Sequence, residues 1–377
     1  GVFKVGIDLI WLLMELTHTL QLASACWQRS FAVPTHFNLV DEPFIPVQKS
    51  DGTFLELSVS ETLEQAPNII ELADPSPLVT IALHRVLLAV LHAAYRGPKN
   101  KKERVAIRQA GQFDRTKLDA YMQKWHDRFD LFHATHPFLQ RAGFKTKEPS
   151  GVNRLAQELS RGNNAALFDH TIDDPPPTFT PAQAARALIA EQAFAVGGGK
   201  SDTGNTTHAP LVSGAVVLAK GENLFETLWM NLTVYDNDVR PMASDGTDLT
   251  NWERKPKAPH EQSTEPSGYL DCLVWPARTI LLHPEELDGA TVVRRASYAQ
   301  GRKFAPKSTD FQDPMIAYFR TDEGHKPVRF NEFRDLWRDM APNAVTADLS
   351  FNDVPNTPRK VQNVAIRNCS GTVARRD

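Results

Sequence analysis

The chain has 377 residues, of which 41% are hydrophobic and 23% charged, a composition typical of a globular protein with one large domain or two medium ones. Its 42 basic and 45 acidic residues leave a net charge of −3, so binding to nucleic acid would require a local cluster of basic residues. Three widely spaced cysteines without a CxxC pair argue against a cysteine zinc site and against a disulfide scaffold, so we expect a reducing, cytoplasmic environment.

The first apolar segment, VGIDLIWLLMELTHTLQLASACW, has the outline of a signal peptide. Only one basic residue precedes its apolar run, and Asp8 and Glu15 interrupt it. The run is also too short and too polar to cross a membrane. We therefore expect an apolar helix or an upstream extension here, and neither secretion nor membrane insertion.

The regular elements follow in chain order from local patterns. Residues 37–63 predict a β-hairpin that turns at Ser50-Asp51-Gly52, and Leu78–Tyr95 predicts a buried helix. Residues 114–132 predict an amphipathic helix, and residues 181–196 a helix that begins at Thr180-Pro181.

The second half of the chain is less regular. Residues 211–232 predict a strand, a turn at Lys220-Gly221 and a helix, and residues 268–283 one or two strands. A further hairpin is expected at residues 313–330 and a helix at residues 331–340. Without a repeat or a strict βαβ alternation, the fold class is α+β: a large irregular mixed domain with helices and short antiparallel hairpins.

Basic residues cluster in three runs. Residues 95–108 (YRGPKNKKERVAIR) carry six basic residues against one acid, as a solvated surface or as a surface for nucleic acid or a partner. Residues 290–309 contain five basic residues and no acid, with Tyr298 and Phe304 among them, a pattern that suits phosphate contact and base stacking. The tail, residues 359–377, is also basic.

The segment AVGGGKSDTGNTTHAP, residues 195–210, resembles a phosphate-binding loop at first sight. A Walker A motif requires a glycine where Phe194 stands, and it follows a strand, whereas here a predicted helix precedes the loop. Bare glycine backbone beside Lys200 can instead approach another surface closely, with its N–H groups facing phosphates or base edges. A ligand-contacting loop and a flexible connection both remain open.

The segment FDHTIDD gathers Asp169, His170, Asp173 and Asp174, which are residue types that bind metal ions. Its use in a metal-dependent hydrolase would require further ligands, and no second cluster of similar density is evident. No nucleophile elbow or Cys/His signature points to covalent catalysis. The sequence therefore predicts no metal, cofactor or catalytic residue, with the hydrolase as the alternative.

The order of several motifs resembles the CasA protein, the large subunit of the type I-E CRISPR Cascade surveillance complex. These motifs are FNLVDEPFIPV (37–47), HPFLQ (136–140), LFDHT (167–171), GGGKS (197–201), WMNL (229–232) and DPMIAY (313–318). The resemblance covers residues 37–377, which would form a CasA-like globular domain. Residues 1–36 are an unmatched extension, and the four-helix bundle that ends family members is expected to be absent from this chain.

The resemblance implies a cytoplasmic, non-enzymatic protein. Its partners would be double-stranded target DNA, the guide-RNA-bearing Cascade subunits and a helicase-nuclease effector. It would read the protospacer-adjacent motif (PAM) in duplex DNA, largely through the minor groove, help to start strand separation and recruit the effector.

The same resemblance assigns the DNA-binding residues. Gly197, Gly198 and Gly199, with Lys200 beside them, would enter the minor groove. Phe168, Asp169 and His170 would lie in a loop near the PAM, Arg320 would act as a basic finger, and Asn368 as a polar wedge.

Overall fold

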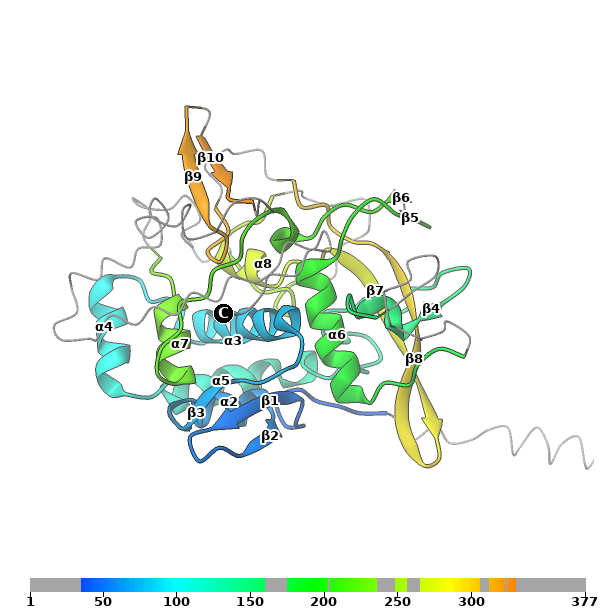
Figure 1. Ribbon diagram of the computed structural model, residues 1–377. Coiled ribbons are helices and arrows are strands. Elements are labelled where there is room, and N and C mark those ends of the chain that lie inside the picture. The colour runs from blue at the N-terminus through cyan, green and yellow to red at the C-terminus, as the bar shows by residue number, and fades with distance from the viewer. Residues whose placement is uncertain are drawn as a thin grey trace, which may run out of the picture. The chain divides into compact units, whose positions relative to one another are not determined.

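The computed structural model describes residues 35–159, 175–202, 204–235, 248–255, 265–305, 312–322 and 324–329 (Figure 1). The chain divides into two compact units, Gly1–His36 and Phe37–Asp377. Almost all described residues belong to the second unit, whose fold is described here.

The second unit begins with a three-stranded antiparallel sheet in the order β2-β1-β3, built from β1 (Ile45–Lys49), β2 (Phe54–Leu57) and β3 (Ile69–Leu72). The predicted hairpin is confirmed as β1 and β2, because Ile45 pairs with Leu57 and Gln48 with Phe54. The short helices α2 (Val59–Glu64) and η1 (Ala66–Asn68) lead from β2 to β3. Ser58 and Glu61 form a capping box that starts α2.

Helix α3 (Pro77–Tyr95) is the central element of the core and confirms the predicted buried helix. Ser76 caps its first turn, and Arg96 ends it in a left-handed conformation. Its length and apolar composition would suffice to cross a membrane, the single such helix in the described part of the chain. Here it is enclosed by protein, because it packs against α5, α6, α7 and α8 (Figure 1).

The remaining helices surround α3. Helix α4 packs against α7, and α6, whose predicted start at Thr180-Pro181 is confirmed by a capping box, packs along α3. The helices are α4 (Lys101–Ala110), α5 (Arg115–Trp125), η2 (His126–Arg128), η3 (Val152–Leu155), α6 (Pro181–Phe194), η4 (Pro210–Ser213), α7 (Leu224–Asn231) and α8 (Tyr269–Leu273).

A second antiparallel sheet has the order β4-β8-β7, with β4 (Ser150–Gly151), β7 (Arg278–Leu287) and β8 (Ala290–Gln300). The register of β7 against β8 shifts between His283 and Pro284, where proline cannot donate to the ladder. Val293 and Tyr298 of β8 face the core.

Two small hairpins complete the fold. Strands β5 (Lys200–Ser201) and β6 (Gly204–Asn205) follow α6, and β9 (Tyr318–Thr321) and β10 (Gly324–Pro327) confirm the hairpin expected at residues 313–330. Both hairpins lie along the upper edge of the domain as drawn in Figure 1.

The α+β class is confirmed, but three local predictions were wrong. The helix expected to reach residue 132 is shorter, since α5 ends at Trp125. The strand expected after residue 211 is replaced by η4 and a single bridge at Val216. The start of the segment 268–283 is helix α8, because the buried carboxylate of Asp248 accepts the N–H groups of Leu270 and Asp271 and thereby caps it.

Candidate nucleic-acid interface

The glycine segment forms an ordered β-hairpin, residues 195–209, directly after α6. Its base closes where the N–H of Ala209 donates to the carbonyl of Ala195 at 2.9 Å. Higher up, Gly198 donates to Thr206 at 3.0 Å and Thr206 donates back to Gly199 at 2.8 Å. We call this element the glycine hairpin, and it is not a flexible connection.

Two of the three glycines are required by the hairpin itself. A Cβ on Gly197 would lie 2.7 Å from backbone atoms of Thr207 and His208 on the opposite arm. Gly198 has a φ of +110°, which L-amino acids with side chains rarely adopt. The close approach that these glycines allow is therefore, at Gly197, an approach to the protein's own backbone.

The amide groups of the glycines are used within the hairpin. Gly197 donates to Nδ1 of His208 at 3.1 Å, and Gly199 donates to Oγ1 of Thr206 at 3.0 Å. Since Gly198 also donates internally, the expectation that these N–H groups face phosphates or base edges is wrong. The position of the loop after a helix and within a hairpin likewise rules out a Walker A geometry.

The outward side of the glycine hairpin is open. Gly198, Gly199 and the side chain of Lys200 are exposed, and no atom lies within 4 Å of a Cβ built on Gly198. The result is a narrow ridge of bare backbone that ends in a positive charge. Such a ridge can enter a groove that would exclude side chains.

The β9–β10 hairpin, which contains Arg320, is rooted in the segment that follows the glycine hairpin. Ala215 donates to Val328 at 2.7 Å, and Val217 donates to Met315 at 2.9 Å. Arg320 pairs with His325 across the ladder. The structure describes the backbone of Arg320 but not its side chain, so its role stays a prediction.

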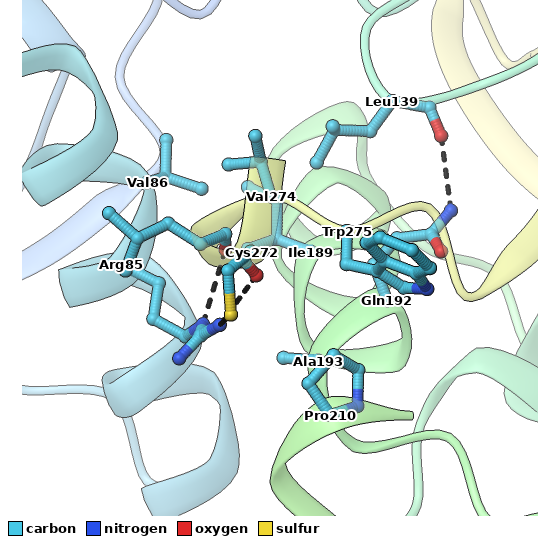
Figure 2. Close-up of a pocket in the computed structure, with 11 residues that line it drawn as sticks. Arg85, Val86, Leu139, Ile189, Gln192, Ala193, Pro210, Cys272, Val274 and Trp275 are labelled. Carbon is cyan, nitrogen blue, oxygen red and sulfur yellow. Dashed lines mark hydrogen bonds between the residues drawn. The ribbon is translucent and has the colours of Figure 1, made fainter. Parts of the chain in front are cut away.

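The root of that hairpin is tied to the core by a buried ion pair. The guanidinium of Arg85 in α3 makes two bonds to the carboxylate of Asp313, at 2.9 and 3.0 Å, and also donates to the carbonyls of Cys272 and Leu273. Figure 2 shows Arg85 reaching toward Cys272 from α3. The cavity beside them has a volume of about 10 Å³, room for one water molecule and for no larger ligand.

The basic run at residues 290–309 does not form the expected stacking surface. Tyr298 is buried, and the ring of Phe304 packs against Trp275 at 5.3 Å. Arg302 is paired with Asp271 at 2.6 Å. Because strand β8 is central in its sheet, these aromatic rings serve the core and are not open to bases.

The run at residues 95–108 does present positive charge. Around the start of α4 the exposed basic residues are Arg96, Lys99, Lys101 and Lys102. Arg104 and Arg108 lie over the ring of Trp229, at 4.6 and 4.9 Å. The last two therefore fasten α4 to α7, and the first four carry the surface charge.

The other predicted site residues lie outside the described part of the chain. These are Phe168, Asp169, His170 and Asn368, together with Asp173 and Asp174 of the alternative hydrolase site. Within the described residues, no group of three His, Cys, Asp or Glu side chains could hold a metal ion.

Sequence reasoning missed two residues that hold the glycine hairpin in place, Arg278 and Gln300. Both are buried and both contact the hairpin directly. Their contacts span 82 and 93 residues of sequence, and no local pattern indicates them.

Comparison with known proteins places this fold among CRISPR-associated proteins. Residues 38–374 match the family CRISPR-associated protein Cse1. The chain therefore belongs to the Cse1 family, also called CasA, which confirms the resemblance of its motifs to a CasA-type large subunit. The CasA/Cse1 protein of Thermus thermophilus is 37% identical over 313 residues, which are 81% of this chain and 59% of that protein.

Solved structures agree with this assignment. The crystal structure of CasA from Thermus thermophilus is 33% identical, with a TM-score of 0.69 over 82% of this chain and 61% of that one. Cse1 from Acidimicrobium ferrooxidans is 27% identical, with a TM-score of 0.70 over 82% of this chain and 60% of that one. A chain of a CRISPR RNA-guided surveillance complex is 26% identical, with a TM-score of 0.69 over 81% and 64%. The chain thus spans about three fifths of the length of these relatives.

Proposed function

We propose that this chain is the DNA-recognition subunit of a type I-E CRISPR Cascade complex. In this role it reads the PAM in duplex DNA, helps to start strand separation and recruits the helicase-nuclease. Its membership of the Cse1 family supports this role, as does its similarity to a chain of an RNA-guided surveillance complex.

The observation that carries the proposal is the exposed ridge of the glycine hairpin. The minor groove of B-DNA is about 6 Å wide, which admits bare backbone more readily than a strand with side chains. Gly198 and Gly199 present such a backbone, and Lys200 adds a charge that the phosphates on either side of the groove would attract. Because the minor groove presents a degenerate pattern of acceptors, we expect several related PAMs to be accepted.

The exposed lysines and arginine at the start of α4 would add sequence-independent attraction to the DNA backbone. We assign no catalytic step to this chain, and we place it in the cytoplasm, where target DNA and the guide-RNA complex would meet. Cleavage would belong to the recruited nuclease.

The proposal can be tested by adding the chain to a guide-RNA complex that lacks its large subunit. Duplex targets carrying a library of flanking trinucleotides are titrated at fixed salt. We expect tighter binding to a restricted set of flanks and loss of this preference in Gly198→Asp, which places bulk and negative charge on the ridge.

A matched control is Gly52→Asp. Gly52 lies in the turn between β1 and β2, has a φ of +85° and, like Gly198, has no atom within 4 Å of a built Cβ. Both substitutions impose a similar backbone strain, of about 1–3 kcal/mol, so a difference in DNA binding reports on location. Equal binding to every flank, also with the C-terminal part of a relative supplied separately, would contradict the proposal.

A further inference from the structure

The buried side chain of Gln300, at the end of β8, holds both arms of the glycine hairpin. Its Oε1 accepts the N–H of Thr207 at 2.7 Å, and its backbone N–H donates to Oγ of Ser201 at 3.1 Å. Its Nε2 lies 3.3 Å from the carbonyls of Ala277 and Gly301 and donates to both. One residue thus joins the hairpin to the second sheet.

Arg278, at the start of β7, holds the hairpin at its base. One nitrogen of its guanidinium donates to the carbonyl of Val196, the residue before the three glycines, at 3.1 Å. Its Nε donates to the hydroxyl of Tyr298 at 2.6 Å, and that hydroxyl donates to the carboxylate of Glu191 at 2.5 Å. The buried cation is therefore held in one orientation by a chain of hydrogen bonds that ends on a buried anion of α6.

These contacts matter because three consecutive glycines lose more conformational freedom on ordering than any other tripeptide of single residue type. If the hairpin were loose in the free protein, the entropy of ordering it would weaken every complex that it forms. Gln300 and Arg278 offset this entropy during folding, before any ligand arrives.

We propose that Gln300 and Arg278 are positioning residues that preorganise the glycine hairpin for entry into the DNA groove. The inference rests on the proposed function, since it assumes that the ridge contacts DNA. Gln300 is 4% exposed and Arg278 1% exposed, so neither side chain lies on the surface that a duplex would touch. They act on binding only through the hairpin.

This mechanism has a signature that separates it from direct contact. Loss of a phosphate contact lowers both the affinity and the slope of log affinity against log salt, by about one unit for one contact. Loss of a positioning residue lowers the affinity and leaves the slope unchanged, because the number of charges facing the DNA stays the same. Lys200→Ala serves as the contact variant in this comparison.

The experiment compares Gln300→Ala with Gln140→Ala in the assembled complex. Gln140 is a matched control, since its Oε1 accepts the N–H of Leu282 at 2.8 Å and its Nε2 donates to Leu131 at 2.7 Å, without contacting the hairpin. We expect Gln300→Ala to weaken binding to a preferred duplex about tenfold with an unchanged salt slope, as loss of about one net hydrogen bond of ordering would. Gln140→Ala should leave the affinity within about twofold of the wild type.

A second variant, Gln300→Glu, adds a pH readout. The neutral carboxylic acid retains one acceptor and one donor, as glutamine does, whereas the ionised form turns an anion toward the carbonyls of Ala277 and Gly301. Burial raises the pKa of such a carboxyl. We expect its DNA affinity to recover toward that of the wild type as the pH falls from about 8 to about 5.5, while the affinity of Gln300→Ala stays low throughout.

Hydrogen exchange of the free protein tests the same idea without DNA. The amides of Gly198, Gly199 and Thr206 should exchange about tenfold faster in Gln300→Ala and at the wild-type rate in Gln140→Ala. If Gly198→Asp weakens binding and Gln300→Ala does not, the positioning role is wrong and the proposed function stands. A salt slope reduced by about one in Gln300→Ala would make it a contact residue and would also overturn the inference. If neither substitution changes binding, the proposed function fails, and the inference fails with it.

Discussion

The ion pair between Arg85 and Asp313 allows a quantitative test of how the β9–β10 hairpin is attached to the core. Both side chains are at most 2% exposed, and the guanidinium meets the carboxylate at two points. Asp313→Ala removes the anion and leaves the cation of Arg85 buried with only neutral partners. Breaking a buried pair in this way costs about 3–5 kcal/mol, mostly because the remaining charge stays desolvated.

This loss is large beside the total stability of a domain, which is about 5–15 kcal/mol. Urea unfolding followed by tryptophan fluorescence would measure it as a fall in the midpoint at a constant m value. Arg115→Ala is the control, because Arg115 pairs with Asp119 and with Glu64 while its side chain is 66% exposed, and such surface pairs contribute less than about 1 kcal/mol.

The double variant Arg85→Met with Asp313→Ala separates charge burial from simple loss of contacts. We expect it to be more stable than Asp313→Ala alone, since no unpaired cation remains. A loss below about 1 kcal/mol for Asp313→Ala, or a double variant less stable by the sum of both single losses, would refute the reasoning.

Three further predictions concern the finger, the core histidines and the buried thiol. Arg320→Ala should weaken DNA binding and reduce its salt slope by about one, and an unaltered slope would assign the finger to another residue. Burial lowers the pKa of His84 and of His92 from 6.5 to about 4, so the stability that each contributes while neutral is complete above pH 6.5 and is lost as the pH falls toward 4. The free energy of unfolding should therefore fall less over this range in His84→Gln than in the wild type, and parallel curves would contradict the assignment. Burial also raises the pKa of the Cys272 thiol, so in a Cys26→Ser, Cys369→Ser background it should react with iodoacetamide only after unfolding, and rapid labelling of the native protein would place it at the surface.

Local sequence patterns predicted the elements whose cause is local. The alternation in β1, the apolar run of α3 and the Thr180-Pro181 start of α6 each carry their own signal, and all three are found where expected. Helix α8 was misread as strand because its N-terminus is capped by Asp248, about twenty residues upstream. A cap supplied from so far away leaves no trace in the segment itself.

The candidate site shows the same division. Its glycines and Lys200 stand out in the sequence by composition, so the exposed ridge could be predicted as a ligand-contacting loop. Tyr298 was misinterpreted because a tyrosine among arginines looks the same on a surface as in a core, and only the pairing of β8 between two strands decides its burial. Gln300 could not be predicted, because its role depends on a contact with Thr207 that only the folded chain creates.

The glycine hairpin and the β9–β10 hairpin are seated on one short stretch of backbone. Ala209 closes the first, and Ala215 and Val217 pair with the root of the second, with η4 between them. This stretch acts as a ruler that keeps the spacing of the two hairpins constant. Redesign of either hairpin would change what it touches without changing the step between the two points of contact. A change in that step would instead require inserting or deleting residues in the stretch from Ala209 to Val217.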